Sequence, residues 1–149
     1  MTRPRWPFFP QRIRMNSLYH AHSGLRFLIL LAAAASLIVL AAGLATGKPL
    51  RATRAVTASF TGLLDLQVLL GIGLVIGGLL TDAATGHLVM MVLAVVVAHA
   101  TSILAARAKD DRRELLTRLI GITLALMLIV GGIMAIGRGV FGSLPASVG

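Results

Sequence analysis

Residues 24–43 read GLRFLILLAAAASLIVLAAG, and this apolar run decides the fold. It contains a single ionisable side chain, Arg26, and about 20 helical residues are enough to cross the roughly 30 Å hydrocarbon core of a bilayer. Three further runs share this character, at about Val56–Leu80, Gly86–Ala106 and Leu119–Ile136. Because lipid offers no partner for backbone polar groups, each run is predicted to be a transmembrane helix.

The composition agrees with this prediction. Only 13% of the residues are charged and the mean hydropathy is +0.91, whereas about a quarter of a soluble domain is charged. We therefore expect an all-α membrane protein, a four-helix up-and-down transmembrane bundle over residues 18–138. A basic tail with three prolines precedes it at 1–17, where the prolines argue against a regular helix, and a short tail follows at 139–149.

The net charge of +9 comes mostly from cations that flank the apolar runs. Nucleic acid is therefore not the expected partner; the cations would meet lipid head groups and set the orientation. Segments 44–55 and 107–118 hold three and five of them. These loops are predicted to be cytoplasmic and both termini outside, in a multi-pass protein of the bacterial inner membrane. A start at Met15 would strengthen that bias by removing the tail arginines.

Ionisable groups inside a membrane span are costly, so each is a functional candidate. His22 and His87 begin the first and third spans, which run parallel, so the two imidazoles are expected at equal depth. Two such rings could hold a haem iron from both sides. Arg26 is one helical turn from His22, where it could meet a haem propionate. The alternative is that His20 and His22 are interfacial residues and Arg26 reaches the membrane surface.

His99 lies 12 residues beyond His87, about 18 Å deeper. Asp65 and Gln67, on the antiparallel second span, should lie at the depth of His99. A pair between His99 and Asp65, or failing that Gln67, would neutralise costly groups. Such a pair could be structural, or part of a quinone or proton site.

Other motifs leave further alternatives open. Met90 and Met91, one turn after His87, are compatible with copper but also with ordinary packing. Small residues in the spans permit close helix contacts, within the chain or between copies: Gly73, Gly77, Gly78, Ala94, Ala98, Gly131 and Gly132.

The absence of cysteine excludes thiolate metal sites and covalently attached haem. No nucleophile–base pair or phosphate-binding loop is present, so independent enzymatic activity is not expected.

Four short motifs resemble a family of small four-span bacterial membrane proteins often described as cytochrome b-like. They lie at residues 20–27 (HAHSGLRF), 66–71 (LQVLLG), 86–91 (GHLVMM) and 98–99 (AH). The second and third are also similar to one half of haem A synthase, a four-helix haem bundle. The resemblance implies haem ligands on different helices of one bundle. Such families often carry an acidic residue before the third-helix histidine, whereas this chain has Gly86.

Residues and resemblance together predict a membrane electron-transfer protein with one haem b near the outer leaflet, ligated by His22 and His87. Quinone is a further expected partner. The alternative from a different class is a haem-free accessory subunit that packs in a larger respiratory or photosynthetic membrane complex.

Overall fold

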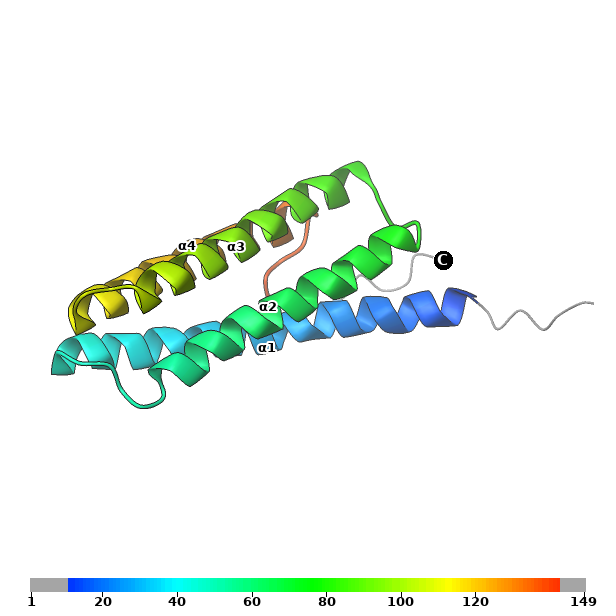
Figure 1. The fold of residues 1–149 in the computed structure, drawn as a ribbon. Helices are drawn as coiled ribbons and strands as arrows, with labels where there is room; N and C mark the ends of the chain where they lie inside the picture. Colours follow the sequence, from blue (N-terminus) through cyan, green and yellow to red (C-terminus); the bar gives the residue numbers. More distant parts are fainter. Residues whose placement is uncertain (1–10, 143–149) are drawn as a thin grey trace, which may run out of the picture.

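The computed structural model describes residues 11–142, which fold into four α-helices and no strand. Figure 1 shows the helices, which are α1 (Gln11–Thr46), α2 (Thr53–Ile76), α3 (Asp82–Ala106) and α4 (Asp111–Ala135). Each is long and apolar enough to cross a membrane. The predicted fold class, an all-α four-helix transmembrane bundle, is confirmed.

The helix ends differ from the predicted spans for local reasons. The expectation of no regular helix in residues 1–17 is wrong from Gln11 onward, because the last proline, Pro10, directly precedes the helix and so costs it no internal hydrogen bond. The second helix, α2, ends at Ile76, whereas the predicted span ends near Leu80. Gly78 follows with a φ of 90°, a conformation that glycine adopts without strain.

Capping side chains extend the third and fourth helices toward their N-termini. Thr81 accepts a hydrogen bond from the backbone N–H of Ala84 (3.2 Å), and Asp110 accepts one from Arg113 (2.8 Å). As a result α4 begins well before the predicted span start at Leu119. Its first two turns are charged and lie outside the apolar stretch.

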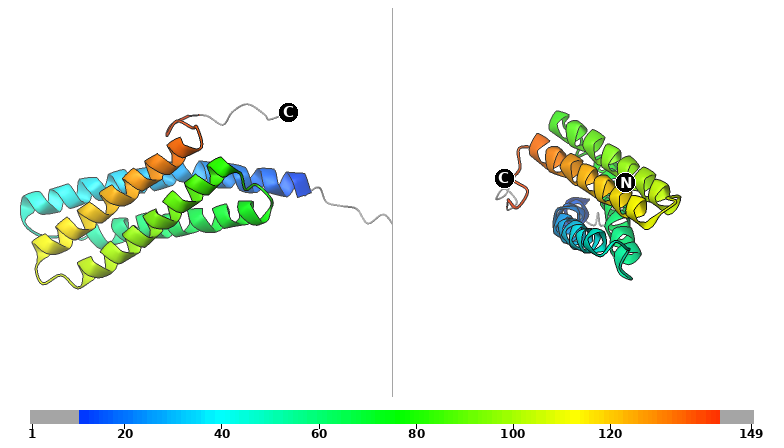
Figure 2. Two further views of the ribbon diagram at one scale, coloured as in Figure 1. Left: turned by 90° about the horizontal axis from the view of Figure 1, so that it is seen from above. Right: turned by 90° about the vertical axis from the view of Figure 1, so that its left-hand side faces the viewer.

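The chain forms two helical hairpins, α1–α2 and α3–α4, which lie one on the other as two layers (Figures 1 and 2). The layers meet at the end that carries loops 47–52 and 107–110, called here the cationic end, and diverge toward the other end. There α1 and α3 begin and α2 and α4 finish; this is called the open end. Going round the bundle the order is α1, α2, α3, α4, so α1 and α3 are diagonal partners.

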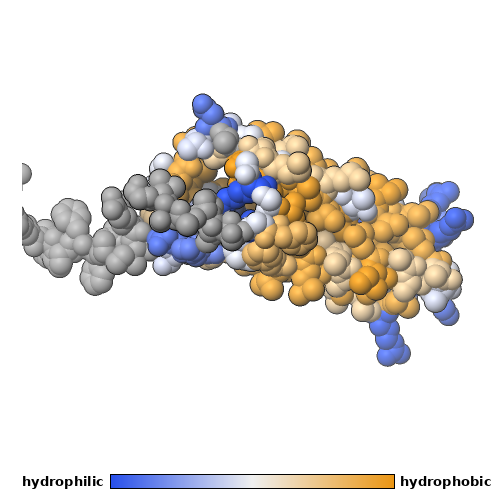
Figure 3. Space-filling model, turned by 180° about the vertical axis from the view of Figure 1, so that it is seen from behind, coloured by the Kyte–Doolittle hydropathy of each residue, from blue (hydrophilic) through white to orange (hydrophobic). Residues whose placement is uncertain are grey.

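The outer surface of the bundle is apolar along the helices, as lipid requires. Figure 3 shows orange, hydrophobic atoms over the body of one face and blue, charged atoms at the cationic end. Large exposed side chains include Leu28, Leu31, Ile38, Leu69, Ile76, Val96, Ile103 and Met127. In water such a surface would drive aggregation, so it supports contact with the bilayer.

Small residues let the helices approach closely within one chain. A Cβ added at Gly121 of α4 would lie 2.5 Å from the Cβ of Thr101 on α3. A Cβ added at Gly73 of α2 would lie 3.1 Å from Leu18 of α1, and one at Gly77 would overlap Met15. Gly73 and Gly77, two of the predicted small residues, therefore permit close contacts within the chain. A Cβ added at Gly78 would have no neighbour within 4 Å among the described residues.

The two hairpins repeat one packing pattern with an offset of 65 positions, which is the separation of His22 from His87. Buried residues of α1 match buried residues of α3, and those of α2 match those of α4: Arg26/Met91, Ile29/Ala94, Ala33/Ala98, Leu40/Ala105, Phe60/Ala125, Leu64/Ile129 and Gln67/Gly132. Ser36 and Thr101, equivalent by the same offset, each donate to the carbonyl four residues earlier, at 2.7 Å. The bundle is thus built from two similar hairpins.

Candidate functional site

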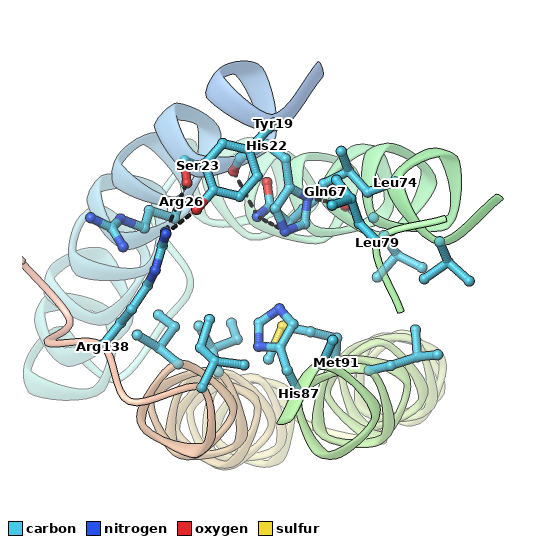
Figure 4. A pocket seen from close by; sticks show the side chains of 18 of the residues that line it. Tyr19, His22, Ser23, Arg26, Gln67, Leu74, Leu79, His87, Met91 and Arg138 are labelled. Carbon is cyan, nitrogen blue, oxygen red and sulfur yellow. Dashed lines mark hydrogen bonds between the residues drawn. The ribbon is translucent and has the colours of Figure 1, made fainter. Parts of the chain in front are cut away.

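A cavity of about 330 Å³ lies between the two hairpins toward the open end. Side chains from all four helices and the loop after α2 line it, and Figure 4 shows them in close-up. The volume falls within the range of small-molecule and cofactor sites, about 300–1,000 Å³. Most of the wall is aliphatic, including Ile29, Leu64, Val68, Leu88, Ile129 and Ile133.

His22 and His87 enter this cavity from diagonal helices and face each other across it (Figure 4). Their ring centres are 6.2 Å apart and the ring planes are nearly perpendicular, at 81°. The parallel first and third spans predicted the two imidazoles at equal depth, and in the structure the rings face each other at that depth. No backbone segment separates them.

Each of the two rings is anchored by the backbone of the next helix in its own hairpin. The Nδ1 of His22 lies 3.2 Å from the carbonyl oxygen of Gln67, and the Nδ1 of His87 lies 2.9 Å from that of Gly132. A carbonyl oxygen can only accept, so both Nδ1 atoms must carry the proton. In a neutral ring the lone pair is then on Nε2, which is the arrangement found when histidine ligates a metal.

Glycines make these two anchors sterically accessible. A Cβ at Gly71, one turn after Gln67, would lie 3.3 Å from Cε1 of His22. A Cβ at Gly132 would lie 3.3 Å from Nδ1 of His87. Both distances are tighter than usual contacts, so the absence of a side chain lets each ring lie against the helix.

Gln67 belongs to this cavity and not to the inner polar site to which depth assigned it. Its side-chain amide donates to the backbone oxygen of His22 (2.9 Å) and lies 3.3 Å from Nε2 of the same ring. The amide oxygen Oε1 is buried and has no hydrogen-bond partner among the described residues. Gln67 therefore satisfies the ring nitrogen that faces His87 and retains an unused acceptor.

Two arginines lie on the α1/α4 side of the cavity. Arg26 is buried against the protein, with 8% of its surface exposed. It donates to the backbone oxygen of Gly142, while its Nε is buried without a partner among the described residues. Arg138 reaches the same side, where it donates to Ser23 (3.2 Å) and to the Tyr19 hydroxyl. In the described part of the chain neither guanidinium has a carboxylate partner, so this side of the cavity favours an anion.

Arg138 was missed as a site residue in the sequence. It follows the fourth span, where a cation is expected at the membrane interface in any case. The available signal was its location: the end of the fourth span and the start of the first lie at the same end of an up-and-down bundle, which brings Arg138 near Arg26.

Asp65 and His99 form a separate polar pair, as their matching depth predicted. His99 Nε2 lies 2.9 Å from Asp65 Oδ1, between α2 and α3. Their side chains are 41% and 49% exposed, so the pair opens onto the outer surface of the bundle rather than into the cavity. It is distinct from the His22–His87 site.

The remaining candidates stand apart from the histidine pair or pack beside it. His20 is exposed, with its ring edge-on to Tyr19. Met90 and Met91 pack on the glycines of α4: a Cβ at Gly132 would lie 2.7 Å from the Met91 methyl group. Among the described residues, no three His, Cys, Asp or Glu side chains cluster so that they could hold a metal ion.

Comparison with known proteins finds no family model, no curated protein and no solved structure that matches this chain.

Proposed function

We propose that this protein binds one b-type haem between His22 and His87 and serves as a membrane electron carrier. The observation that carries the proposal is the paired geometry of the rings. They face each other at 6.2 Å across a largely aliphatic cavity, and each Nδ1 is tied to a backbone carbonyl. Histidines that ligate metals are usually held in this way.

The separation of the rings fits a single iron. A metal–imidazole bond is about 2 Å long, and the ring centre lies about 1 Å behind the nitrogen, so two axial rings have centres about 6 Å apart. The ring centres of His22 and His87 are 6.2 Å apart, which matches this distance. Ligation requires one local change, because the Gln67 amide must turn from Nε2 of His22 while it keeps its bond to the backbone oxygen.

The two arginines fit the carboxylates of such a group. Arg26 and Arg138 present guanidinium donors at one side of the cavity, and the buried Nε of Arg26 lacks a partner among the described residues. Charge-assisted bonds to propionates would offset the repulsion between the two cations. Haem bound in this way would supply a one-electron centre whose two axial positions are filled, which favours electron transfer over oxygen chemistry.

The test is an absorption spectrum of the protein purified from haem-replete cells. We expect a six-coordinate low-spin spectrum that is abolished by His22→Ala or His87→Ala. His20→Ala and His99→Ala are matched controls, because these residues lie outside the cavity, and they should keep the spectrum. A haem-free wild-type protein would overturn the proposal and favour the accessory-subunit function.

We further propose a location in the bacterial inner membrane, with the cationic end in the cytoplasm and both termini outside. The support is the cation count of the loops at that end. Reporter fusions after Lys109 and after Gly149 should report opposite compartments, with Gly149 outside. The reverse pattern would refute this orientation.

A further inference from the structure

The Asp65–His99 pair is unusual because it faces outward at membrane depth. Asp65 lies near the middle of α2, about 18 Å along the axis from Thr53. Exposed aliphatic side chains follow or precede the pair by one helical turn: Leu69 on α2, and Val96 and Ile103 on α3. Ionisable groups in a span almost always face the bundle interior or a water-filled cavity. Here about half of each side chain is open to the lipid-facing side.

Helix packing alone does not require this pair. The hairpin repeat relates the α2/α3 seam to the α4/α1 seam, where the equivalents of Asp65 and His99 are Val130 and Ala34. The α4/α1 seam packs more extensively than α2/α3 without any polar pair at these positions. The repeated packing pattern thus forms at one seam without such a pair, so the pair is a feature of the α2/α3 seam alone.

The pair offers an acceptor and a donor side by side. His99 Nε2 and Asp65 Oδ1 bond to each other, while Oδ2 of Asp65 and Nδ1 of His99 make no hydrogen bond with any described residue. A ligand that reaches them must dissolve in the hydrocarbon core, which excludes water-soluble metabolites. Phospholipid head groups stay at the interface, and the carboxylate of Asp65 would repel a fatty acid.

We propose that Asp65 and His99 bind the head group of a lipid-soluble quinone or hydroquinone. A hydroquinone hydroxyl donates to Oδ2 of Asp65. A quinone carbonyl accepts from the Nδ1–H of His99 in its imidazolium form, whose Nε2–H donates to Oδ1 of Asp65. The site is back to back with the cavity across α2, since Leu64 and Gln67 line the cavity from the opposite face of that helix. Quinone binding at this site does not depend on the proposed haem. Exchange of electrons with the His22–His87 site does, and so rests on the proposed function.

Binding is tested with decyl-ubiquinone and its hydroquinone on the full chain in lipid nanodiscs, by equilibrium titration. Asp65→Asn should weaken the hydroquinone and His99→Gln the quinone, each by at least about tenfold, the worth of one hydrogen bond to a charged group. Asp82→Asn and His20→Gln are matched controls on exposed residues and should bind like the wild type. An azido-quinone should crosslink to α2 and α3 beside the pair.

Several outcomes would overturn the inference: no saturable binding to the wild type, wild-type affinity in the Asp65 and His99 variants, or crosslinks elsewhere on the bundle. So would a second protein chain that covers the pair and is released by Asp65→Asn. Circular dichroism confirms that each variant is helical before its titration counts. Because quinone binding is measured on haem-free protein as well, loss of haem and loss of quinone are separate results.

Discussion

Replacement of Gly121 by alanine should destabilise the bundle through the contact of α3 with α4. The new Cβ would lie 2.5 Å from Cβ and 2.9 Å from Cγ2 of Thr101, whereas non-bonded carbons prefer about 3.5–4.0 Å. Rotation of the threonine side chain moves Cγ2 but not Cβ, so the helices must separate by about 1 Å. Overpacking of this kind costs about 1–3 kcal/mol, and alanine returns about 1 kcal/mol of helix propensity.

We therefore expect Gly121→Ala to lower the free energy of unfolding by about 1 kcal/mol, measured by SDS titration in mixed micelles with circular dichroism as the readout. Gly62→Ala is the matched control, because nothing lies within 4 Å of its added Cβ; it should be neutral or stabilising. The double variant Gly121→Ala/Thr101→Gly should recover part of the loss. A Gly121→Ala protein as stable as the wild type would refute the close contact.

The remaining predictions concern the repeat and the cavity. Ala33→Leu and Ala98→Leu should each cost about 1–3 kcal/mol in the same unfolding assay, because both sites are buried at equivalent positions of the two hairpins; a cost at only one would contradict the repeat. Gly132→Ala should push α3 away from α4 and lengthen the hydrogen bond from His87 Nδ1 to the Gly132 carbonyl, since its Cβ would lie 2.7 Å from the Met91 methyl group, 3.1 Å from Cβ of Met90 and 3.3 Å from Nδ1; nitrogen NMR should then show a shifted Nδ1 signal, which an undisturbed ring would not. Arg138→Gln should speed loss of haem to an acceptor protein at least about tenfold, and the difference should vanish with haem dimethyl ester.

Much of the fold could be predicted because hydropathy fixes depth. A helix rises by a constant 1.5 Å per residue, so the length of each apolar run sets the height of every side chain in it. That constraint predicted His22 at the depth of His87 and Asp65 at the depth of His99. In the structure the first pair faces across the cavity with ring centres 6.2 Å apart, and the second pair is hydrogen-bonded. The depth of a side chain can be assigned once the direction of its span is known, and the short loops determine that direction.

Rotation about the helix axis could not be predicted in the same way. Gln67 and Asp65 are two residues apart, close in depth but about 200° apart around α2, so one faces the cavity and the other faces outward. Almost the whole surface of each helix is apolar, which leaves no polar stripe to indicate the inner face. The backbone anchors of the histidines were invisible for another reason: carbonyl oxygens are present at every residue, and only glycines such as Gly71 mark the places where a ring can approach them.

The attachment of His22 to Gln67 has a consequence for the order of assembly during synthesis. Both residues belong to the first hairpin, which enters the membrane before α3 exists. The side-chain amide and the backbone carbonyl of Gln67 bind the His22 imidazole within this hairpin, so the ring has hydrogen-bond partners in lipid before α3 is inserted. His87 arrives later with its own anchor on α4. Each hairpin can thus fold as a unit with its histidine already anchored. The cavity between the two histidines forms only when the hairpins pack together.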